Sequence, residues 1–382
     1  MRFLHTGDLH IGKIVNDFSM LEDQRHILKQ IYEIACSKKV DAIVLAGDIY
    51  DRAIPPAEAV VVLNDFLNDM VQAKIPVLMI SGNHDSPERV GFADKILEKQ
   101  GIHIAGVYKE VLKQVTLQDD YGEVTFVLMP FVKPAVVGTK TSAEAVGKML
   151  DSLKAREAWT AKKRCVLVSH YFVTNNGQEP ELSDGETTIH VGGLDNVEVS
   201  LFDGFDYVAL GHIHKPQRIG EGQVYYAGSS LAYSFSETGQ TKYVNLVEVK
   251  QKGQVSVEQI ALKPLHEMRK IKGKIEELMK PEIVEAADFQ DYIQAQLTNE
   301  EELIDPIGTL RSVYPNIMQI VLTKNERKEG TEYVSRLEEK RKSIPELFKG
   351  FYEMIRGEEP DEERMNIIGA VAKEAGEDIY EA

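Results

Sequence analysis

Five short segments of the sequence carry residue types that bind metal ions, and each one follows an apolar stretch. They are Asp8-Leu9-His10, Gly47-Asp48-Ile49-Tyr50-Asp51, Gly82-Asn83-His84-Asp85, Ser169-His170 and Gly211-His212-Ile213-His214. Half of the chain's ten histidines fall in these segments. Because ligands of open α/β sheets bind at the carboxyl ends of the strands, we expect the five segments to converge on one site.

The residue types in these segments are chemically compatible with one another. Carboxylate oxygen, imidazole nitrogen and amide oxygen form a mixed donor set that suits divalent ions such as Mn²⁺ and lacks the thiolates of structural zinc sites. One carboxylate can bridge two ions about 3.5–4 Å apart, as in two-metal hydrolases. Gly7, Gly47, Gly82 and Gly211 each lie just before a candidate ligand, where the backbone must turn sharply and approach the site closely.

Apolar runs and amphipathic stretches alternate over residues 1 to about 265, which predicts a layered α/β fold. Apolar residues at helical spacing predict helices at Met20–Lys38 and Ala57–Ala73. Strands are predicted at Arg2–His5, Asp41–Ala46, Val77–Ile80, Phe126–Met129, Val166–Val168, Tyr207–Leu210 and Tyr243–Val249.

The pattern changes after Leu262. Glu267–Lys280 and Asp288–Leu297 are typical of helices, and Asn316–Thr323 is typical of a strand. The charged stretch Lys324–Lys342 predicts a linker. Beyond it, residues 344–382 contain two amphipathic helical patterns that are separated by Gly357-Glu358-Glu359-Pro360.

Length and composition limit the classes of protein that are possible. A chain of 382 residues is long enough for two or three domains. Its net charge of −17 counts against DNA as a partner, since DNA-binding proteins usually present a basic surface. Bound divalent ions would reverse the charge locally, and a second subunit could supply a positive surface.

The sequence contains no sign of a membrane segment or a disulfide framework. No apolar run approaches the roughly 18 residues that span a bilayer, and the N-terminus has no signal-peptide core. Cys36 and Cys165 are the only cysteines, and we expect both to be buried thiols. We therefore expect a cytoplasmic protein without membrane contact.

The five segments, taken in order, resemble the motifs of the calcineurin-like metallophosphoesterases. Longer stretches are similar to the SbcD family, the nuclease subunits of bacterial SbcCD complexes, and these are Gly47–Pro56, Val208–Gln217 and Tyr226–Glu237. The resemblance covers essentially the whole chain and is strongest in residues 1–240. Beyond Leu262 the resemblance depends on the arrangement of the segments along the chain and on the stretch Leu310–Asn316.

This resemblance implies a role for each motif residue, with two divalent metal ions, Mn²⁺ before others, as cofactors. The ligands of the first ion would be Asp8, His10, Asp48 and His214. The ligands of the second ion would be Asp48, Asn83, His170 and His212, so Asp48 would bridge the two. His84 would not be a ligand. It would face the scissile phosphate and assist the leaving oxygen, with Asp85 orienting its ring.

The resemblance also implies activities and partners. The activities are 3′→5′ exonuclease action on duplex ends, single-strand endonuclease action and hairpin opening, in DNA repair, recombination and replication. The partners are DNA and SbcC, an ABC-type ATPase, in a heterotetramer. A homodimer would be joined through helices near Ala57–Ala73 and Glu88–Lys99.

We accordingly predict three regions: a nuclease domain at 1–265, a capping, DNA-contacting domain at 266–325, and a linker with an SbcC-binding tail at 326–382. The tail has too many large apolar residues for two short helices to bury by themselves. We expect four of them to anchor it on SbcC, namely Leu347, Phe348, Phe351 and Ile355.

Simpler interpretations exist for several of these residues. A single histidine at a strand end is more often structural than a ligand, and we interpret five histidines outside the motifs as structural or surface residues: His5, His26, His103, His190 and His266. Arg52 is a candidate for phosphate contact, but it could equally pair with Asp51 or Glu88. The segment Gly7–Lys13 resembles the start of a P-loop, yet Ile14 stands where Ser or Thr is required, so we expect no nucleotide on this chain.

Two other functions compete with a DNA nuclease. One is a small-molecule or protein phosphatase on the same metal core, but Ile11 stands where protein phosphatases have glycine, and a minimal phosphatase has no use for the long C-terminal region. The other is a metal-free scaffold, which the complete set of candidate ligands argues against.

Overall fold

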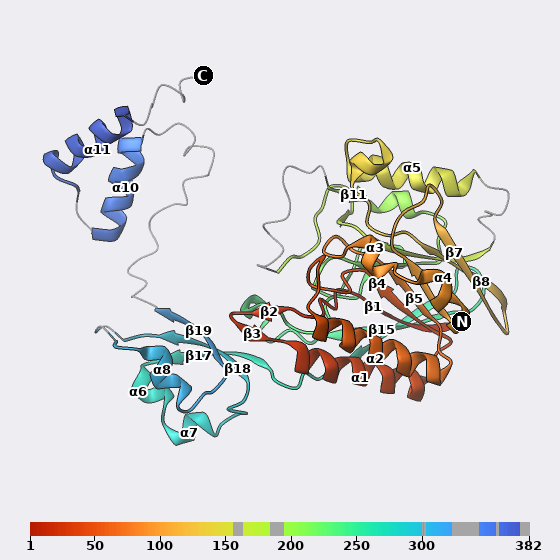
Figure 1. Ribbon diagram of the computed structural model, residues 1–382, viewed down its shortest axis with the longest axis horizontal. Helices are drawn as coiled ribbons and strands as arrows, with labels where there is room; N and C mark the ends of the chain where they lie inside the picture. Colours follow the sequence, from red (N-terminus) through yellow and green to blue (C-terminus); the bar gives the residue numbers. More distant parts are fainter. Residues whose placement is uncertain are drawn as a thin grey trace. The chain divides into compact units, whose positions relative to one another are not determined.

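The computed structural model describes residues 1–155, 163–183, 195–299, 301, 303–322, 344–356 and 359–374. The chain divides into two compact units, Met1–Lys324 and Asn325–Ala382. The described part of the first unit contains two six-stranded sheets and a three-stranded sheet, and the second contains two helices (Figure 1).

The two large sheets face one another. The strands of the first, in spatial order, are β16 (Val255–Ala261), β15 (Tyr243–Val249), β1 (Arg2–Thr6), β4 (Ala42–Ala46), β5 (Val77–Ile80) and β6 (Ile102–Ala105). Those of the second are β13 (Gln217–Arg218), β14 (Val224–Tyr226), β12 (Tyr207–Gly211), β9 (Arg164–His170), β8 (Gly122–Leu128) and β7 (Lys113–Asp119). Apolar side chains from both sheets form the core between them, and Phe3 packs edge-on against Phe126 with ring centroids 5.2 Å apart.

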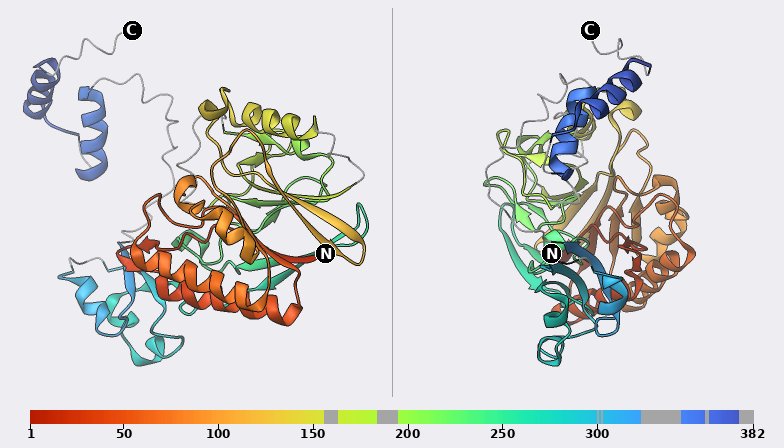
Figure 2. Two further views of the ribbon diagram at one scale, coloured as in Figure 1. Left: turned by 45° about the vertical axis from the view of Figure 1, so that its right-hand side comes forward. Right: turned by 90° about the vertical axis from the view of Figure 1, so that its left-hand side faces the viewer.

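Helices cover the outer faces of both sheets, which makes four layers (Figure 2). The first sheet packs against α1 (Leu21–Lys38) and α2 (Ala57–Ala73), and the second packs against α5 (Ser142–Lys154). Because the central strands are buried on both faces, they are continuous apolar runs, and all five residues of β4 are buried.

The predicted layered α/β fold is confirmed, and its predicted strands and both helices lie where the sequence indicated. Five strands of the two large sheets were not predicted: β6, β13, β14, β7 and β16. The last two lie at the edges of their sheets and alternate between half-buried and exposed positions. Edge strands with this pattern give a weak apolar signal.

The predicted helix at Asp288–Leu297 is wrong, and the one predicted at Glu267–Lys280 is helical only at α6 (Ile275–Leu278). The chain there forms the parallel strands β17 (Met268–Gly273) and β18 (Tyr292–Leu297), which pair with β19 (Ile317–Leu322). Ile293 and Leu297 are four residues apart, as on a helix face, but Ala295 shares their buried face, as in a strand. So short a segment fits both periods, and strand pairing decides between them. The predicted strand at Asn316–Thr323 is confirmed as β19.

The three-stranded sheet has its own small core. One face packs against α6 (Ile275–Leu278) and α8 (Pro306–Arg311), and Tyr314 is buried with them. Near the amino ends of the strands, Met268 and Tyr292 pack instead into the core beneath α1 and α2. This sheet is therefore attached to the large sandwich through the residues at one end of its strands.

The second unit contains α10 (Ile344–Arg356) and α11 (Glu362–Glu374), which confirms the two predicted tail helices. Phe351 is exposed, and Phe348 lies against Tyr352 with ring centroids 5.9 Å apart. The side chains of Leu347 and Ile355 lie outside the part of the chain that the structure describes, as does the predicted linker Lys324–Lys342.

Both cysteines are free thiols, but only one is buried. Cys165 is buried in β9, whereas Cys36 is exposed. The expectation that Cys36 is buried is wrong because Ala35, its neighbour on α1, occupies the buried face, and the next residue of a helix points about 100° away. None of the described helices is both long and apolar enough to cross a bilayer.

Candidate metal centre

The five motif segments meet at the carboxyl ends of strands from both large sheets. Asp8 follows β1, Asp48 follows β4 and Asn83 follows β5, whereas His170 ends β9 and His212 follows β12. Isolated β-bridges join the first segment to other loops: Gly7, just before Asp8, pairs with Ser229, and Ile11, just after His10, pairs with Tyr50.

The candidate ligands form two groups. In the first, His10 Nε2 lies 3.1 Å from His214 Nε2. In the second, Asn83 Oδ1 lies 2.9 Å from both His170 Nε2 and His212 Nδ1. Two imidazole nitrogens as close as those of the first group require a shared proton or cation between them.

The carboxylate of Asp48 lies between the two groups. Its Oδ2 atom is 3.8 Å from His10 Nε2 and 3.2 Å from His170 Nε2. Two sets of potential metal-binding atoms share this residue: His10, Asp48 and His84 in one, and Asp8, Asp48 and His170 in the other. Asp48 is therefore placed where a bridging ligand would be.

Two further features of the site fit bound divalent cations. Asp8 is fully buried, and its Oδ1 accepts the backbone N–H of His212 at 2.8 Å, while its Oδ2 is a buried acceptor without a hydrogen bond. The site also leaves no room for larger residues beside the ligands. A Cβ atom on Gly82 would lie 2.2 Å from Asp48 Oδ1, and one on Gly47 would lie 2.4 Å from His170 Nδ1.

The backbone at the site is held in an uncommon conformation. Four candidate ligands have positive φ angles: Asp8 (49°), His10 (43°), Asp48 (46°) and His212 (104°). Non-glycine residues adopt this region at a cost of about 1–3 kcal/mol each, and they do so most often at functional sites. The loops are therefore shaped to aim side chains rather than to minimise local backbone energy.

Comparisons with known proteins identify the family of the chain. Residues 1–216 match the calcineurin-like phosphoesterase family, and residues 264–355 match the type 5 capsule protein repressor C-terminal domain. The SbcD subunit of the nuclease SbcCD from Staphylococcus epidermidis is 30% identical over 360 residues, which cover 92% of each chain. Its counterpart from Staphylococcus saprophyticus is 33% identical over 330 residues, which cover 84% of each chain.

This chain belongs to the SbcD family of calcineurin-like phosphoesterases. It is a metal-dependent phosphodiesterase. Among solved structures, a dimetal phosphatase from Danio rerio is 12% identical with a TM-score of 0.40, over 68% of this chain and 95% of that one. So distant a likeness adds nothing to the assignment, which rests on the sequence matches.

Burial and mutual charge shift the pKa values of the site residues of this SbcD family member. Burial raises the pKa of Asp8 to about 7, although His170 and His214 act in the opposite direction. Burial also disfavours the charged form of Asp48, but His170 and His10 hold its pKa well below the usual range. Burial lowers the pKa of His170, yet Asp48 and Asp8 raise it to about 9. Cations that bind here must therefore displace protons.

The ring of His170 has a fixed orientation. Its Nδ1 lies 2.7 Å from the carbonyl oxygen of Ala46. A carbonyl only accepts, so Nδ1 carries a proton and donates it. Nε2, on the side of Asp48 and Asn83, is therefore the nitrogen that gives up its proton when a cation binds.

His84 is fixed in a similar way, but not by the residue we expected. Its Nδ1 donates to the carbonyl oxygen of Asp51 at 3.0 Å, and its backbone N–H donates to Asp48 Oδ1 at 2.9 Å. Its side chain is only partly buried. His84 also lies within the first set of potential metal-binding atoms, with His10 and Asp48.

The expectation that Asp85 orients the ring of His84 is wrong in this structure. Both carboxylate oxygens of Asp85 accept backbone N–H groups: those of Ile49 at 3.0 Å, Tyr50 at 2.9 Å and Gly82 at 2.8 Å. These three residues are buried, so their N–H groups need an acceptor within the protein. Asp85 therefore ties the loop of Asp48 to the loop of His84.

The remaining predicted residues lie outside this centre. Arg52 is exposed, and no ion pair involves it within the described residues.

The described histidines outside the motifs lie away from the centre. His5 is buried between the hydroxyl of Tyr207 and the carbonyl of Leu210, which confirms it as structural. His26 and His103 are partly buried away from the centre, His266 pairs with Asp23, and His190 lies outside the described residues.

Three residues beside the centre were missed as site residues. Lys13 donates to Asp51 Oδ1 at 2.7 Å, and Asp51 Oδ1 lies 3.5 Å from His10 Nδ1. Glu237 Oε1 lies 3.8 Å from His214 Nδ1. A signal existed for two of them, because Asp51 ends its motif and Glu237 ends the stretch Tyr226–Glu237.

Proposed function

We propose that this chain is a two-metal DNA nuclease, with the two ions held by the seven motif residues. The observation that carries the proposal is the position of Asp48, whose Oδ2 reaches imidazoles of both groups, at 3.8 Å and 3.2 Å. One carboxylate that bridges two groups of ligands is the arrangement of two-metal hydrolases. The ligand sets are Asp8, His10, Asp48 and His214 for one ion, and Asp48, Asn83, His170 and His212 for the other.

The protein residues have distinct tasks in this proposal. When bound, the ions supply a water molecule activated as a nucleophile and neutralise charge on the phosphoryl group. His84, partly exposed at the centre and held by the carbonyl of Asp51, protonates the leaving oxygen. Asp85 maintains the distance between the loops that carry Asp48 and His84. Arg52, exposed next to the second motif, contacts a substrate phosphate.

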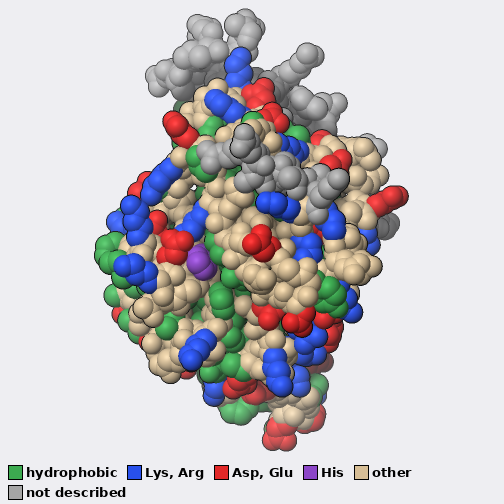
Figure 3. Space-filling view, turned by 90° about the vertical axis from the view of Figure 1, so that its right-hand side faces the viewer, with side chains coloured by type: hydrophobic (Ala, Val, Ile, Leu, Met, Phe, Trp, Pro, Cys, Tyr) green, Lys and Arg blue, Asp and Glu red, His purple; other side chains and the backbone are tan. Residues whose placement is uncertain are grey.

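We propose Mn²⁺ as the metal, because nitrogen and oxygen ligands without thiolate suit borderline-to-hard divalent ions such as Mn²⁺. The chain's net charge of −17 does not favour DNA binding, and basic and acidic side chains are interspersed on the face shown in Figure 3. In this proposal the ions and a partner subunit provide the positive charge.

The relatives support the nature of the substrate and the partner. Both are named as subunits of the nuclease SbcCD, so we propose SbcC as the partner ATPase and DNA as the substrate, in a heterotetramer. We propose 3′→5′ exonuclease, single-strand endonuclease and hairpin-opening activities, a role in repair, recombination and replication, and a cytoplasmic location.

A homodimer is part of the same proposal. Val60 and Val61 on α2 are 46% and 51% exposed, and Phe92 and Ile96 are 78% and 71% exposed. The region expected to form one helix at Glu88–Lys99 consists instead of α3 (Pro87–Val90), α4 (Asp94–Leu97) and a 3-10 turn. Exposed apolar groups of this size mark a contact surface.

The test compares substrates under one set of conditions. Purified protein is supplied with Mn²⁺ and given linear duplex DNA, p-nitrophenyl phosphate or bis-p-nitrophenyl phosphate. We expect cleavage of the diesters and of DNA, and none when the ions are chelated. Hydrolysis of the monoester alone would identify a phosphatase, and absence of bound metal would identify a scaffold.

A further inference from the structure

The two ring nitrogens of His214 face different partners. Its Nε2 lies 3.1 Å from His10 Nε2, on the side of the metal centre, whereas its Nδ1 lies 3.8 Å from Glu237 Oε1. At this distance the carboxylate of Glu237 forms an ion pair with the ring whenever His214 is protonated. If His214 binds a metal ion through Nε2, the carboxylate of Glu237 therefore faces the opposite nitrogen of the same ring.

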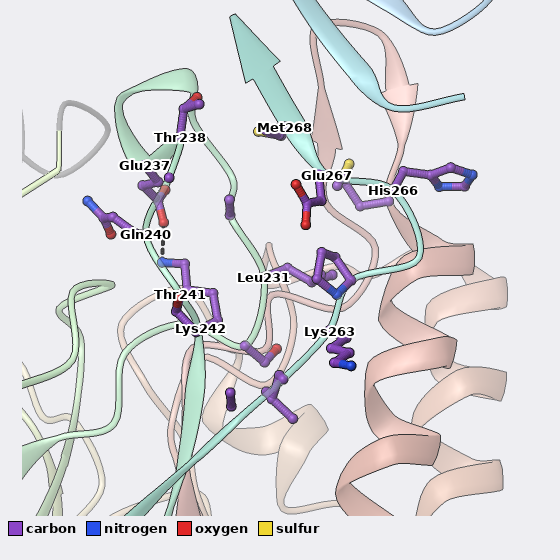
Figure 4. A pocket seen from close by; sticks show the side chains of 17 residues that line it. Leu231, Glu237, Thr238, Gln240, Thr241, Lys242, Lys263, His266, Glu267 and Met268 are labelled. Carbon is purple, nitrogen blue, oxygen red and sulfur yellow. Dashed lines mark hydrogen bonds and ion pairs between the residues drawn. The ribbon is translucent and has the colours of Figure 1, made fainter. Parts of the chain in front are cut away.

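Glu237 is buried and held from two sides. It is 1% exposed, its Oε1 accepts the backbone N–H of Tyr233 at 3.2 Å, and its Oε2 accepts from the ammonium group of Lys242. Figure 4 shows this pair in the wall of a pocket of about 400 Å³ that is formed largely by residues 237–242 and 261–268.

Lys242 contacts the backbone of the same histidine that Glu237 faces. Its Nζ donates to the carbonyl oxygen of His214 at 3.1 Å and to Ser229 Oγ at 3.0 Å. The backbone N–H of Ser229 also donates to that carbonyl, at 3.1 Å. The pair therefore restrains His214 at both its backbone and its ring.

Burying the charges of Glu237 and Lys242 costs desolvation free energy, which an uncharged contact would avoid. Removing two charges from water is expensive, and well-packed apolar residues in the same place are often as stabilising. His170 shows that a backbone carbonyl is sufficient to orient a ring. A full negative charge behind a ligand does more, because it fixes the tautomer and makes the opposite nitrogen a stronger donor to a metal.

We propose that Glu237, held by Lys242, is the positioning residue for His214, and that it directs Nε2 toward the first metal ion and strengthens that bond. This inference rests on the proposed function, since it assumes that His214 is a ligand. It assigns a role to two residues outside the motif segments.

The test measures Mn²⁺ affinity, not only cleavage. Full-length protein carrying Glu237→Gln is titrated with Mn²⁺ and the free ion is followed by electron paramagnetic resonance. We expect the affinity of one site to fall about 10–100-fold and that of the other to change little. The matched control is Asp206→Asn, because Asp206 is also a buried carboxylate paired with a lysine, Lys252 at 3.0 Å, and touches none of the proposed ligands.

A second variant separates positioning from folding. Glu237→Gln leaves Lys242 buried without its counter-ion, whereas Glu237→Gln with Lys242→Met removes both charges, and its melting temperature should return toward that of the wild type. We expect Mn²⁺ affinity to stay low in this double variant. Wild-type affinity there, or a loss in Glu237→Gln no larger than in Asp206→Asn, would overturn the proposal. Titration of Asp48→Ala shows whether the metal site itself is assigned correctly: unchanged affinity in that variant would contradict the proposed function instead.

Discussion

The carboxylate of Asp48 lies within reach of both groups of imidazoles, so its removal affects two ions at once. We expect Asp48→Ala to lose both metals or most of their occupancy, as measured by elemental analysis of the purified protein. Asp206→Asn serves as the control for loss of a buried carboxylate. Near-full metal content in Asp48→Ala would show that Asp48 is not the bridge.

His84 tests the difference between a ligand and a proton donor. As a non-ligand, it can be replaced without loss of metal, so His84→Ala should retain both ions and bind DNA. Its cleavage rate should fall by about 10²–10⁴-fold, the usual contribution of a general acid or base. Loss of metal in this variant would mean that His84 is a ligand, which its distance from His10 and Asp48 permits.

His5 provides a prediction about pH. Burial lowers its pKa from 6.5 to about 3, although its contact with Leu210 acts in the opposite direction. The unfolded chain therefore binds more protons than the native protein between these values, and the free energy of unfolding falls as the pH drops below 6.5. His5→Gln should lose this contribution. Urea unfolding of the metal-free protein at pH 7 and pH 5 should then show a pH dependence that is smaller by roughly 1–2 kcal/mol. An unchanged dependence would mean that His5 takes up a proton in the folded protein as readily as in the unfolded chain.

At the scale of elements, the tail helices α10 and α11 belong to a unit of their own, and Phe351 is 58% exposed. A segment this short rarely builds its own core, so we propose that it docks on SbcC through Leu347, Phe348, Phe351 and Ile355. Truncation after Lys342 should leave a folded protein with Mn²⁺-dependent nuclease activity and no co-purification with SbcC. Precipitation of the truncated protein would place the tail in the main core, and binding to SbcC at full strength would place the anchor elsewhere.

The three-stranded sheet is a different case, because contacts within the first unit hold it. Asp23 of α1 is fully buried and accepts from the backbone N–H of His266 at 3.0 Å, from its ring Nδ1 at 3.0 Å and from the hydroxyl of Tyr292 at 2.8 Å. These bonds join α1 to the segment that leads into β17 and to β18. One buried carboxylate thus joins the proposed capping domain at 266–325 to the nuclease domain, in addition to the apolar contacts of Met268 and Tyr292.

For the whole molecule, this tie predicts cooperative unfolding of the sandwich and the small sheet. Asp23→Asn should destabilise the protein by about 1.5–3 kcal/mol, the usual contribution of hydrogen bonds to a charged group. Tyr292→Phe removes only one of the three bonds and should cost about 1 kcal/mol. Calorimetry should resolve two transitions in Asp23→Asn, and a single transition with an unchanged midpoint would show that the sheet is held by apolar contacts alone.

The sequence by itself determined the strands that carry the site and the identity of its candidate ligands. Both are local properties: an apolar run predicts a buried strand, and residues such as Asp48 or His170 directly after it must lie at its carboxyl end. The two tail helices were predictable for the same reason, because helical periodicity persists over each segment.

Only the tertiary structure decided which groups meet. The ring of His84 donates a hydrogen bond to the carbonyl of Asp51 rather than to Asp85, and the carboxylate of Glu237 faces Nδ1 of His214. These contacts form because the two packed sheets bring together loops that follow different strands. The strands β17 and β18 were missed because their short apolar patterns fit a helix equally well, and pairing with distant strands determines their conformation. Contacts between residues far apart in the chain leave no periodic pattern in the sequence, so they become visible only in the folded structure.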